Sequence, residues 1–279
     1  MPELPEVETA RILARRVAVG RRIARVWCAD DPIVFGGLTS LRFRRALSGS
    51  RVRGVGRHGK HLWLELDRRP WPCFHFGMTG GFSTPRARGV KLISSGDRDP
   101  GDGWPPRFTK LRLVFDDGGE LVMTDARRLG RIRLRMDPRA EPPISELGFD
   151  ALLGLLPPAR FSAMLADRGA PVKALLLDQS FAAGVGNWIA DEVLYQARIA
   201  PRRPARSLTP AEARRLRARL RSVVHAAVAA RADSDRYPRS WLFHHRWGRD
   251  AAAVTARGEK IRHDTIGGRT TAWVPAIQR

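Results

Sequence analysis

Cysteine is almost absent from this chain, and its scarcity excludes two structural classes. The 279 residues contain two cysteines, Cys28 and Cys73, which are far apart and form no CxxC pair. A disulfide scaffold and a four-cysteine zinc site are therefore both excluded. The sequence also lacks a signal peptide and any apolar run of about 18 residues. We expect a reduced, soluble, intracellular protein that does not insert into a membrane.

Acidic residues are few relative to basic ones. Lys and Arg total 50 against 28 Asp and Glu, so the formal net charge is +22. The basic residues are spread along the whole chain, which favours a polyanionic partner. Genome base composition can explain Arg in place of Lys, but it does not explain the excess of charge. Binding to a membrane surface is the weaker alternative, because no long amphipathic helix or lipidation signal occurs.

The first half of the chain has the pattern of one helix followed by many short strands. A helix is predicted from Pro5, at its first position, to about Val17. Residues 21–134 then contain short β-rich runs separated by DDP, GG and DDGG turn signals, a pattern typical of a sandwich or barrel. Residues 94–106, rich in Gly, Asp and Pro, are predicted to form a mobile loop.

The second half is predicted to be helical, and its last part returns to strands. MDPRAEPP (136–143) is the best candidate for a linker. Apolar residues at helical spacing follow it in several segments, the first of them ISELGFDALL (144–153). The longest, which begins at Thr209, has an N-cap, a proline at N1 and a glutamate at N3. Near the C-terminus, two short strands are predicted to flank a turn at Gly267–Gly268, beside Arg269. The fold class is therefore α+β with two domains.

Two segments carry possible chemistry. QSFAAGVGNW (179–188) has two glycines before a helix, a geometry that suits phosphate binding, although by itself the segment is better explained as a plain connecting loop. At the N-terminus, removal of Met1 would leave Pro2 as a free secondary amine beside Glu3. In the simpler interpretation, Glu3 and Glu6 are acids favoured by the dipole at a helix start.

Taken together and in order, these motifs resemble the formamidopyrimidine-DNA glycosylase / endonuclease VIII family of base-excision repair enzymes. The resemblance covers nearly the whole chain and rests on PELPEVE, GRHGKHL, HFGMTG, TDARRLGRI, LLLDQSFAAGVGNWIADEVLYQARIAP and GGRTTAWVP. It implies an N-terminal helix on a β-sandwich (1–135), a linker (136–143), a helix–two-turn–helix domain (144–232) and a β-hairpin finger (233–279).

The resemblance also implies a reaction and the residues that perform it. The enzyme would be a bifunctional glycosylase and abasic-site (AP) lyase that forms a Schiff base on the N-terminal proline and then cleaves the strand by β,δ-elimination. An α-amine titrates nearer neutrality than a lysine, so more of it is available as a nucleophile. The catalytic residues implied are Pro2, Glu3, Glu6, Lys60 and Arg269. By itself, Lys60 could equally be a solvated charge at a strand end.

The partner implied by the resemblance is double-stranded DNA that contains oxidised bases or abasic sites, bound by a monomer wherever the cell keeps its DNA. The DNA-binding residues implied are His75, Met78, Arg127, Leu129, Arg168, Asn187 and Arg269. Asn187 and Arg269 match phosphate contacts that help flip the nucleotide. Met78, Arg127 and Leu129 match residues that fill the space left in the base stack by the flipped nucleotide. Many members carry Phe at the position of Leu129, so the leucine is expected to fill this space less well.

Two departures from the family pattern change the expectations. The finger lacks the usual four cysteines, and His244, His245 and His263 make no convincing substitute, so no zinc or other cofactor is expected. Apolar packing would hold the finger instead, through Trp247, Ile261, Ile266, Trp273, Val274 and Ile277. The segment 232–243 is short where purine-specific members carry a longer lesion-closing loop. Formamidopyrimidines and hydantoins are therefore expected to be better substrates than 8-oxoguanine.

Three alternatives to this function remain open. The chain could be an oxidised-pyrimidine glycosylase of endonuclease VIII type, although Leu4 matches the formamidopyrimidine branch. A catalytically silent protein that binds damaged DNA would be expected to lack Pro2, Glu3 or Lys60, and all three are present. An RNA-binding module would explain the charge but not the nucleophile and acid at the N-terminus.

Overall fold

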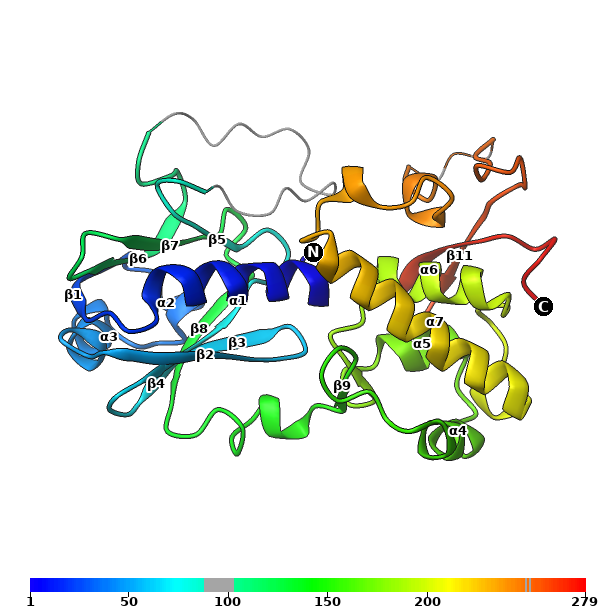
Figure 1. Ribbon diagram of the computed structural model, residues 1–279, viewed down its shortest axis with the longest axis horizontal. Coiled ribbons are helices and arrows are strands. Elements are labelled where there is room, and N and C mark those ends of the chain that lie inside the picture. The colour runs from blue at the N-terminus through cyan, green and yellow to red at the C-terminus, as the bar shows by residue number, and fades with distance from the viewer. Residues whose placement is uncertain (88–102, 249, 251) are drawn as a thin grey trace. The chain divides into compact units, whose positions relative to one another are not determined.

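The computed structural model describes residues 1–87, 103–248, 250 and 252–279. They form two compact units, Met1–Glu146 and Leu147–Arg279 (Figure 1). Strands dominate the first unit and helices the second, which confirms the predicted α+β class. The finer domain limits, with a linker at 136–143, remain predictions. Of the loop predicted over 94–106, residues 94–102 lie outside the described ranges.

Two four-stranded antiparallel sheets build the first unit, and together they form the predicted sandwich. Their strand orders are β1–β6–β7–β5 and β2–β3–β4–β8. The strands are Ile23–Cys28 (β1), Val52–His58 (β2), His61–Leu66 (β3), Trp71–His75 (β4), Gly81–Ser83 (β5), Thr109–Phe115 (β6), Glu120–Thr124 (β7) and Arg131–Arg135 (β8). In β6, inward and outward residues alternate, as expected for a sheet with one face on a core.

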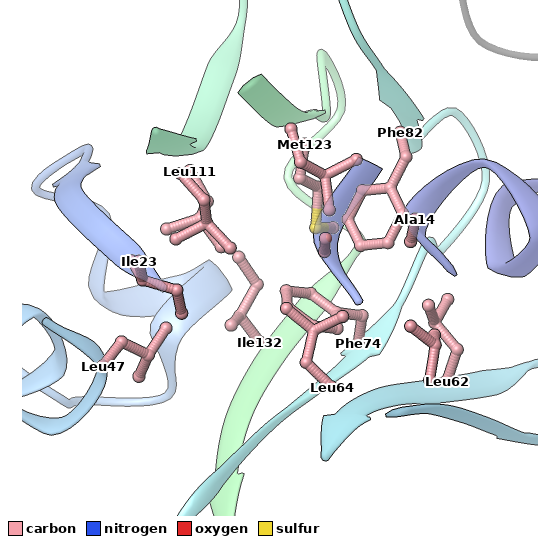
Figure 2. Packing of buried hydrophobic residues seen from close by; sticks show 14 of the residues in the cluster. Ala14, Ile23, Leu47, Leu62, Leu64, Phe74, Phe82, Leu111, Met123 and Ile132 are labelled. Atoms are coloured by element: carbon pink, nitrogen blue, oxygen red, sulfur yellow. The ribbon is translucent and has the colours of Figure 1, made fainter. Parts of the chain in front are cut away.

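The inward side chains of both sheets and of helix α1 (Leu4–Ala18) form one core. Figure 2 shows residues of the two sheets converging there, with Ala14 of α1 beside them: Leu62, Leu64 and Phe74 from one sheet, and Phe82, Leu111 and Met123 from the other. Because small alanines line the buried face of α1, the helix approaches closely and contacts β2 and β3 of one sheet and β5 and β7 of the other. The N-terminal end of α1 is thus held by the core.

Two details of the first unit differ from the sequence-based prediction. Helix α1 begins at Leu4, so Pro5 is its second residue rather than its first. Two helices, α2 (Pro32–Phe35) and α3 (Ser40–Leu47), lie in a region predicted to be mainly strands. Both are short, and α3 buries only Phe43 and Leu47, so their periodic signal is too brief to stand out from turns.

The described part of the second unit is built around four helices. They are α4 (Pro158–Ala166), α5 (Val172–Leu177), α6 (Asn187–Ala197) and α7 (Pro210–Ala229). The capping box predicted at the start of α7 is present, with Thr209 and Glu212 hydrogen-bonded to each other's backbone. None of the described helices is both long and apolar enough to cross a membrane.

One predicted helix, ISELGFDALL (144–153), is wrong. The chain instead forms a 3₁₀ turn at Ile144–Glu146 and the short strand β9 (Phe149–Asp150), which pairs in parallel with β10 (Ala182–Ala183). A Cβ on Gly148 would lie 2.2 Å from the carbonyl oxygen of Phe181, so only glycine permits this pairing. Asp150 then accepts hydrogen bonds from the N–H groups of the next turn.

The C-terminal segment forms the predicted hairpin, with strands β11 (Arg262–Ile266) and β12 (Arg269–Trp273). Three further 3₁₀ turns precede it, at Ala205–Ser207, Ser234–Arg236 and Leu242–His244. Of the six residues predicted to hold the finger, Ile261, Val274 and Ile277 join a cluster with Tyr195 and Leu242. The other three also pack or bond: Ile266 is buried, Trp247 lies edge-on to Phe243, and Trp273 donates to Asp264.

Candidate active site

The N-terminal residues are buried at the start of α1. Pro2 is buried, and Glu3, the N-cap of the helix, is 3% exposed. The backbone N–H of Glu3 donates to the carboxylate of Glu6 at 2.9 Å, so one acid fixes the backbone that carries the other. Burial, and then the nearby carboxylate of Glu3, raise the pKa of Glu6 to about 7. Pro2 and two acidic side chains are thus placed together at the start of α1.

Residues distant in the sequence influence the terminal amine. Burial lowers the pKa of the amino group at Met1, the positive charges of Lys60 and Arg127 lower it further, and the carboxylates of Glu3 and Glu6 oppose the change. Four of the predicted site residues therefore act on the same amine. A lowered pKa leaves more of the Met1 amine unprotonated near neutral pH.

Lys60 lies on the tight turn between β2 and β3 and is only 7% exposed. The next residue, His61, packs its ring against His75 of β4, with the ring centroids 4.7 Å apart. Nδ1 of His75 accepts the N–H of Gly77, which leaves Nε2 as the nitrogen that carries the proton in the neutral ring. Burial, followed by the charge of Lys60, lowers the pKa of His75 to about 4, so the ring is neutral at pH 7.

Met78, Arg127 and Leu129 lie on two neighbouring loops. Gly77, with a φ of +60°, packs so closely on the second loop that a Cβ would lie 2.4 Å from the backbone carbon of Leu129. Asp125 is fully buried and organises both loops: its carboxylate accepts the hydroxyl of Thr79 and the backbone N–H groups of Arg127 and Gly130. Leu129 is 41% exposed although apolar. Asp125 was missed by the sequence reasoning, although an aspartate directly after a strand is a turn signal.

In the second unit, Asn187 and the hairpin are joined directly. Asn187 begins α6, and its Nδ2 donates to the carbonyl oxygen of Thr270 at 2.8 Å, while its buried Oδ1 has no hydrogen-bond partner among the described residues. Gly267, at the tip of the hairpin, lies against α5: a Cβ added to this glycine would be 3.2 Å from the Cα of Ala174. Arg269 is exposed beside that tip. Arg168 is also exposed, after α4, and no described contact joins it to Asn187 or Arg269.

A buried charged cluster supports this hairpin and was also missed from sequence. Asp191 of α6 is fully buried and accepts hydrogen bonds from Lys173 of α5, from the guanidinium of Arg246 and from the backbone N–H of Ala272 in β12. Lys173 also donates to the carbonyl oxygen of Asn187 at 3.0 Å. One carboxylate thus fixes the helix that bears Asn187 to the strand that bears Arg269.

The described residues contain no group of three or more His, Cys, Asp or Glu side chains that could hold a metal ion. The zinc of four-cysteine fingers has no matching ligands in this hairpin, because both cysteines of the chain belong to the first unit and are buried there. The Nε2 atom of His263 instead lies 3.3 Å from the backbone oxygen of Arg246.

Comparisons with known proteins agree with this architecture of a β-sandwich unit followed by a helix–two-turn–helix unit. Residues 1–132 match the model of the formamidopyrimidine-DNA glycosylase N-terminal domain, and residues 147–238 match that of the formamidopyrimidine-DNA glycosylase H2TH domain. The chain belongs to the formamidopyrimidine-DNA glycosylase family.

Named relatives and solved structures cover the chain from end to end. A formamidopyrimidine-DNA glycosylase of Arabidopsis thaliana is 43% identical over all of this chain and 71% of its own length. One from Thermus thermophilus is 35% identical over all of this chain and 98% of its own. The crystal structure of a Lactococcus lactis enzyme of this name, bound non-covalently to DNA containing an AP site, has a TM-score of 0.80 at 22% identity and covers 99% of both chains. At that identity the structural likeness supports the fold alone.

Proposed function

We propose that the protein is a base-excision repair DNA glycosylase with AP lyase activity that removes oxidised bases from double-stranded DNA. The named relatives are formamidopyrimidine-DNA glycosylases, and crystal structures of the fold contain damaged DNA. The observation that carries the proposal for this chain is the buried N-terminus, where Pro2 and Glu3 are buried, Glu6 accepts the backbone N–H of Glu3, and Lys60 lies close enough to influence the terminal charge. We place its action, as a monomer, at the DNA of the cell.

The reaction begins with the amine of Pro2, once Met1 is removed. Its lone pair attacks C1′ of the damaged nucleotide, and the bond from C1′ to the base breaks. The proton that the Pro2 nitrogen gives up ends on the departing base, which leaves as the free base. Glu3 donates a proton to the sugar ring oxygen as the ring opens, and an iminium ion forms between Pro2 and C1′. The iminium acidifies the C2′ proton, so loss of that proton expels the 3′ phosphate, and a second elimination expels the 5′ phosphate. General acid assistance of this kind typically contributes about 10²–10⁴-fold.

The remaining residues position the reactants. Lys60 would bind the phosphate at the lesion and assist proton transfer during elimination, and the Nε2–H of His75 would donate to the DNA. Glu6, which accepts the N–H of Glu3, orients the acid and the nucleophile. Met78, Arg127 and Leu129, on loops fixed by Asp125, would fill the space left by the flipped nucleotide.

The second unit would hold the backbone through Asn187 and Arg269, with Arg168 as a further contact. The bond from Asn187 to Thr270 supports this, because it fixes the helix start to the hairpin. We propose that the hairpin needs no zinc, since packing and the Asp191 cluster supply its order. Residues 232–243 support the proposed lesion preference: Tyr237 and Trp241 are buried against Trp188 in a short, packed segment.

Borohydride trapping on DNA with a single abasic site tests the chemistry. The protein with a free Pro2 should give a covalent adduct, and Pro2→Gly or a retained Met1 should abolish it. An adduct that persists in Pro2→Gly at the native rate would refute the mechanism. A single-turnover panel of lesions tests the substrate: fast excision of 8-oxoguanine opposite cytosine would refute the proposed preference, and a preference for oxidised pyrimidines would favour the endonuclease VIII type.

A further inference from the structure

The carboxylate of Glu8, in the second turn of α1, lies between two arginines. Arg57 of β2 donates from Nε to Glu8 Oε2 at 2.8 Å, and Arg11 of α1 donates from Nη2 to Glu8 Oε1 at 2.7 Å. The side chain of Arg57 is fully buried, and that of Glu8 is 8% exposed. Both side chains are thus largely closed off from solvent, and the proposed reaction assigns neither of them a direct part. A buried ion pair that merely adds stability could have been replaced by apolar residues.

A second hydrogen bond of Arg57 connects this ion pair to the turn that carries Lys60. Nη1 of Arg57 donates to the carbonyl oxygen of Gly59 at 2.9 Å. Gly59 has a φ of +55° and directly precedes Lys60 in the turn between β2 and β3. The single guanidinium therefore connects the helix that carries Pro2 and Glu3 to the turn that carries Lys60.

We propose that Glu8 and Arg57 are positioning residues that hold the Lys60 turn against the N-terminal end of α1 and so set the reactivity of the terminal amine. This inference rests on the proposed function, in which Pro2 is the nucleophile and Lys60 acts beside it. Arginine suits the role because its planar fork bonds two acceptors in fixed directions, which lysine cannot do. A displacement of about 1 Å in a reacting group can cost on the order of 100-fold in rate.

The test compares Arg57→Met with Arg11→Met. Both substitutions remove a guanidinium from Glu8, but Arg11 makes its other contact with the carbonyl oxygen of Val55 and none with the Lys60 turn. Arg57→Met should lower the single-turnover rate of adduct formation roughly 10- to 100-fold, whereas Arg11→Met should stay near the native rate. Affinity for DNA carrying an uncleavable abasic analogue should change little in either variant.

The pH profile separates positioning from a general loss of structure. Lys60 lies close enough to the N-terminus for its charge to lower the pKa of the Met1 amino group, and we expect the same charge to act on the amine of Pro2 once Met1 is removed, so a displaced Lys60 should let the pKa of that amine rise. In a plot of the rate of adduct formation against pH, the acidic limb should therefore move to higher pH in Arg57→Met and not in Arg11→Met. Arg57→Lys and Glu8→Gln repeat the test if Arg57→Met does not fold, and Arg57→Lys should recover only part of the rate.

The proposal is overturned if the limb stays in place in every folded variant at Glu8 and Arg57, or if Arg11→Met shifts it equally. Failure of the proposed function gives a different result. In that case the trapped sugar remnant would lie on a nitrogen other than that of Pro2, whatever the behaviour of the Arg57 variants.

Discussion

Removal of the Asp191 carboxylate should unfold the second unit at a much lower temperature. Asp191 is fully buried and faces Lys173, whose side chain is also fully buried, and Arg246, whose side chain is 5% exposed. Asp191→Ala would leave both cations without this partner, and breaking a buried pair in this way costs about 3–5 kcal/mol. At about 3–5 °C per kcal/mol for a unit of this size, Tm should fall by roughly 10–25 °C.

Scanning calorimetry provides the assay, with Arg202→Ala as the matched control. Arg202 pairs with Asp264 in the same unit, but its side chain is 61% exposed, so its loss should cost about 0–1 kcal/mol. Because Asp191 also accepts the N–H of Ala272 in β12, Asp191→Ala should lose excision activity below its melting point as well. A Tm within about 3 °C of the native value would refute the view that this cluster orders the hairpin.

Four other predictions follow from the same contacts. Arg269→Ala should weaken DNA binding and base excision while partly sparing adduct formation on abasic DNA; equal losses in both assays would argue against a role in lesion handling. Because the pKa of Glu6 is raised to about 7, its ionisation destabilises the fold as pH rises from 4.5 to 7. We therefore expect denaturant unfolding to show that the free energy of unfolding of Glu6→Gln, relative to that of the native protein, is higher at pH 8 than at pH 5 by on the order of 2–3 kcal/mol. The same difference at both pH values would contradict this. EDTA should leave activity intact, and inactivation would mean that a metal holds the finger. DNA affinity should fall steeply with salt in a filter-binding titration, as expected for several phosphate contacts, and a flat response would exclude them.

Local sequence signals predicted much of the fold. The capping box at Thr209 and the paired glycines at Gly267–Gly268 specify a helix start and a hairpin turn through backbone chemistry alone, and the structure has both. The short helix α3 was missed because its eight residues bury only two large side chains. The helix predicted across Gly148 failed because packing against Phe181 overrode the apolar spacing.

The residues of the candidate site were predicted from motifs, but the buried charged residues that hold them in place were not. Pro2, Glu3 and Lys60 carry recognisable sequence context, whereas Glu8 and Arg57 are 49 positions apart and Asp191 and Arg246 are 55 apart. Nothing in the local pattern shows that such residues meet, because the fold alone brings them together. Asp31 is a similar case: its carboxylate pairs with Arg128, 97 positions away, and fixes the loop beside Leu129.

Locating the covalent bond in the trapped protein tests the central claim most directly. Tandem mass spectrometry of the borohydride-reduced adduct should find the sugar remnant on the nitrogen of Pro2, in a chain from which Met1 is missing. Attachment at Lys60, or full activity in a preparation that keeps Met1, would contradict the account.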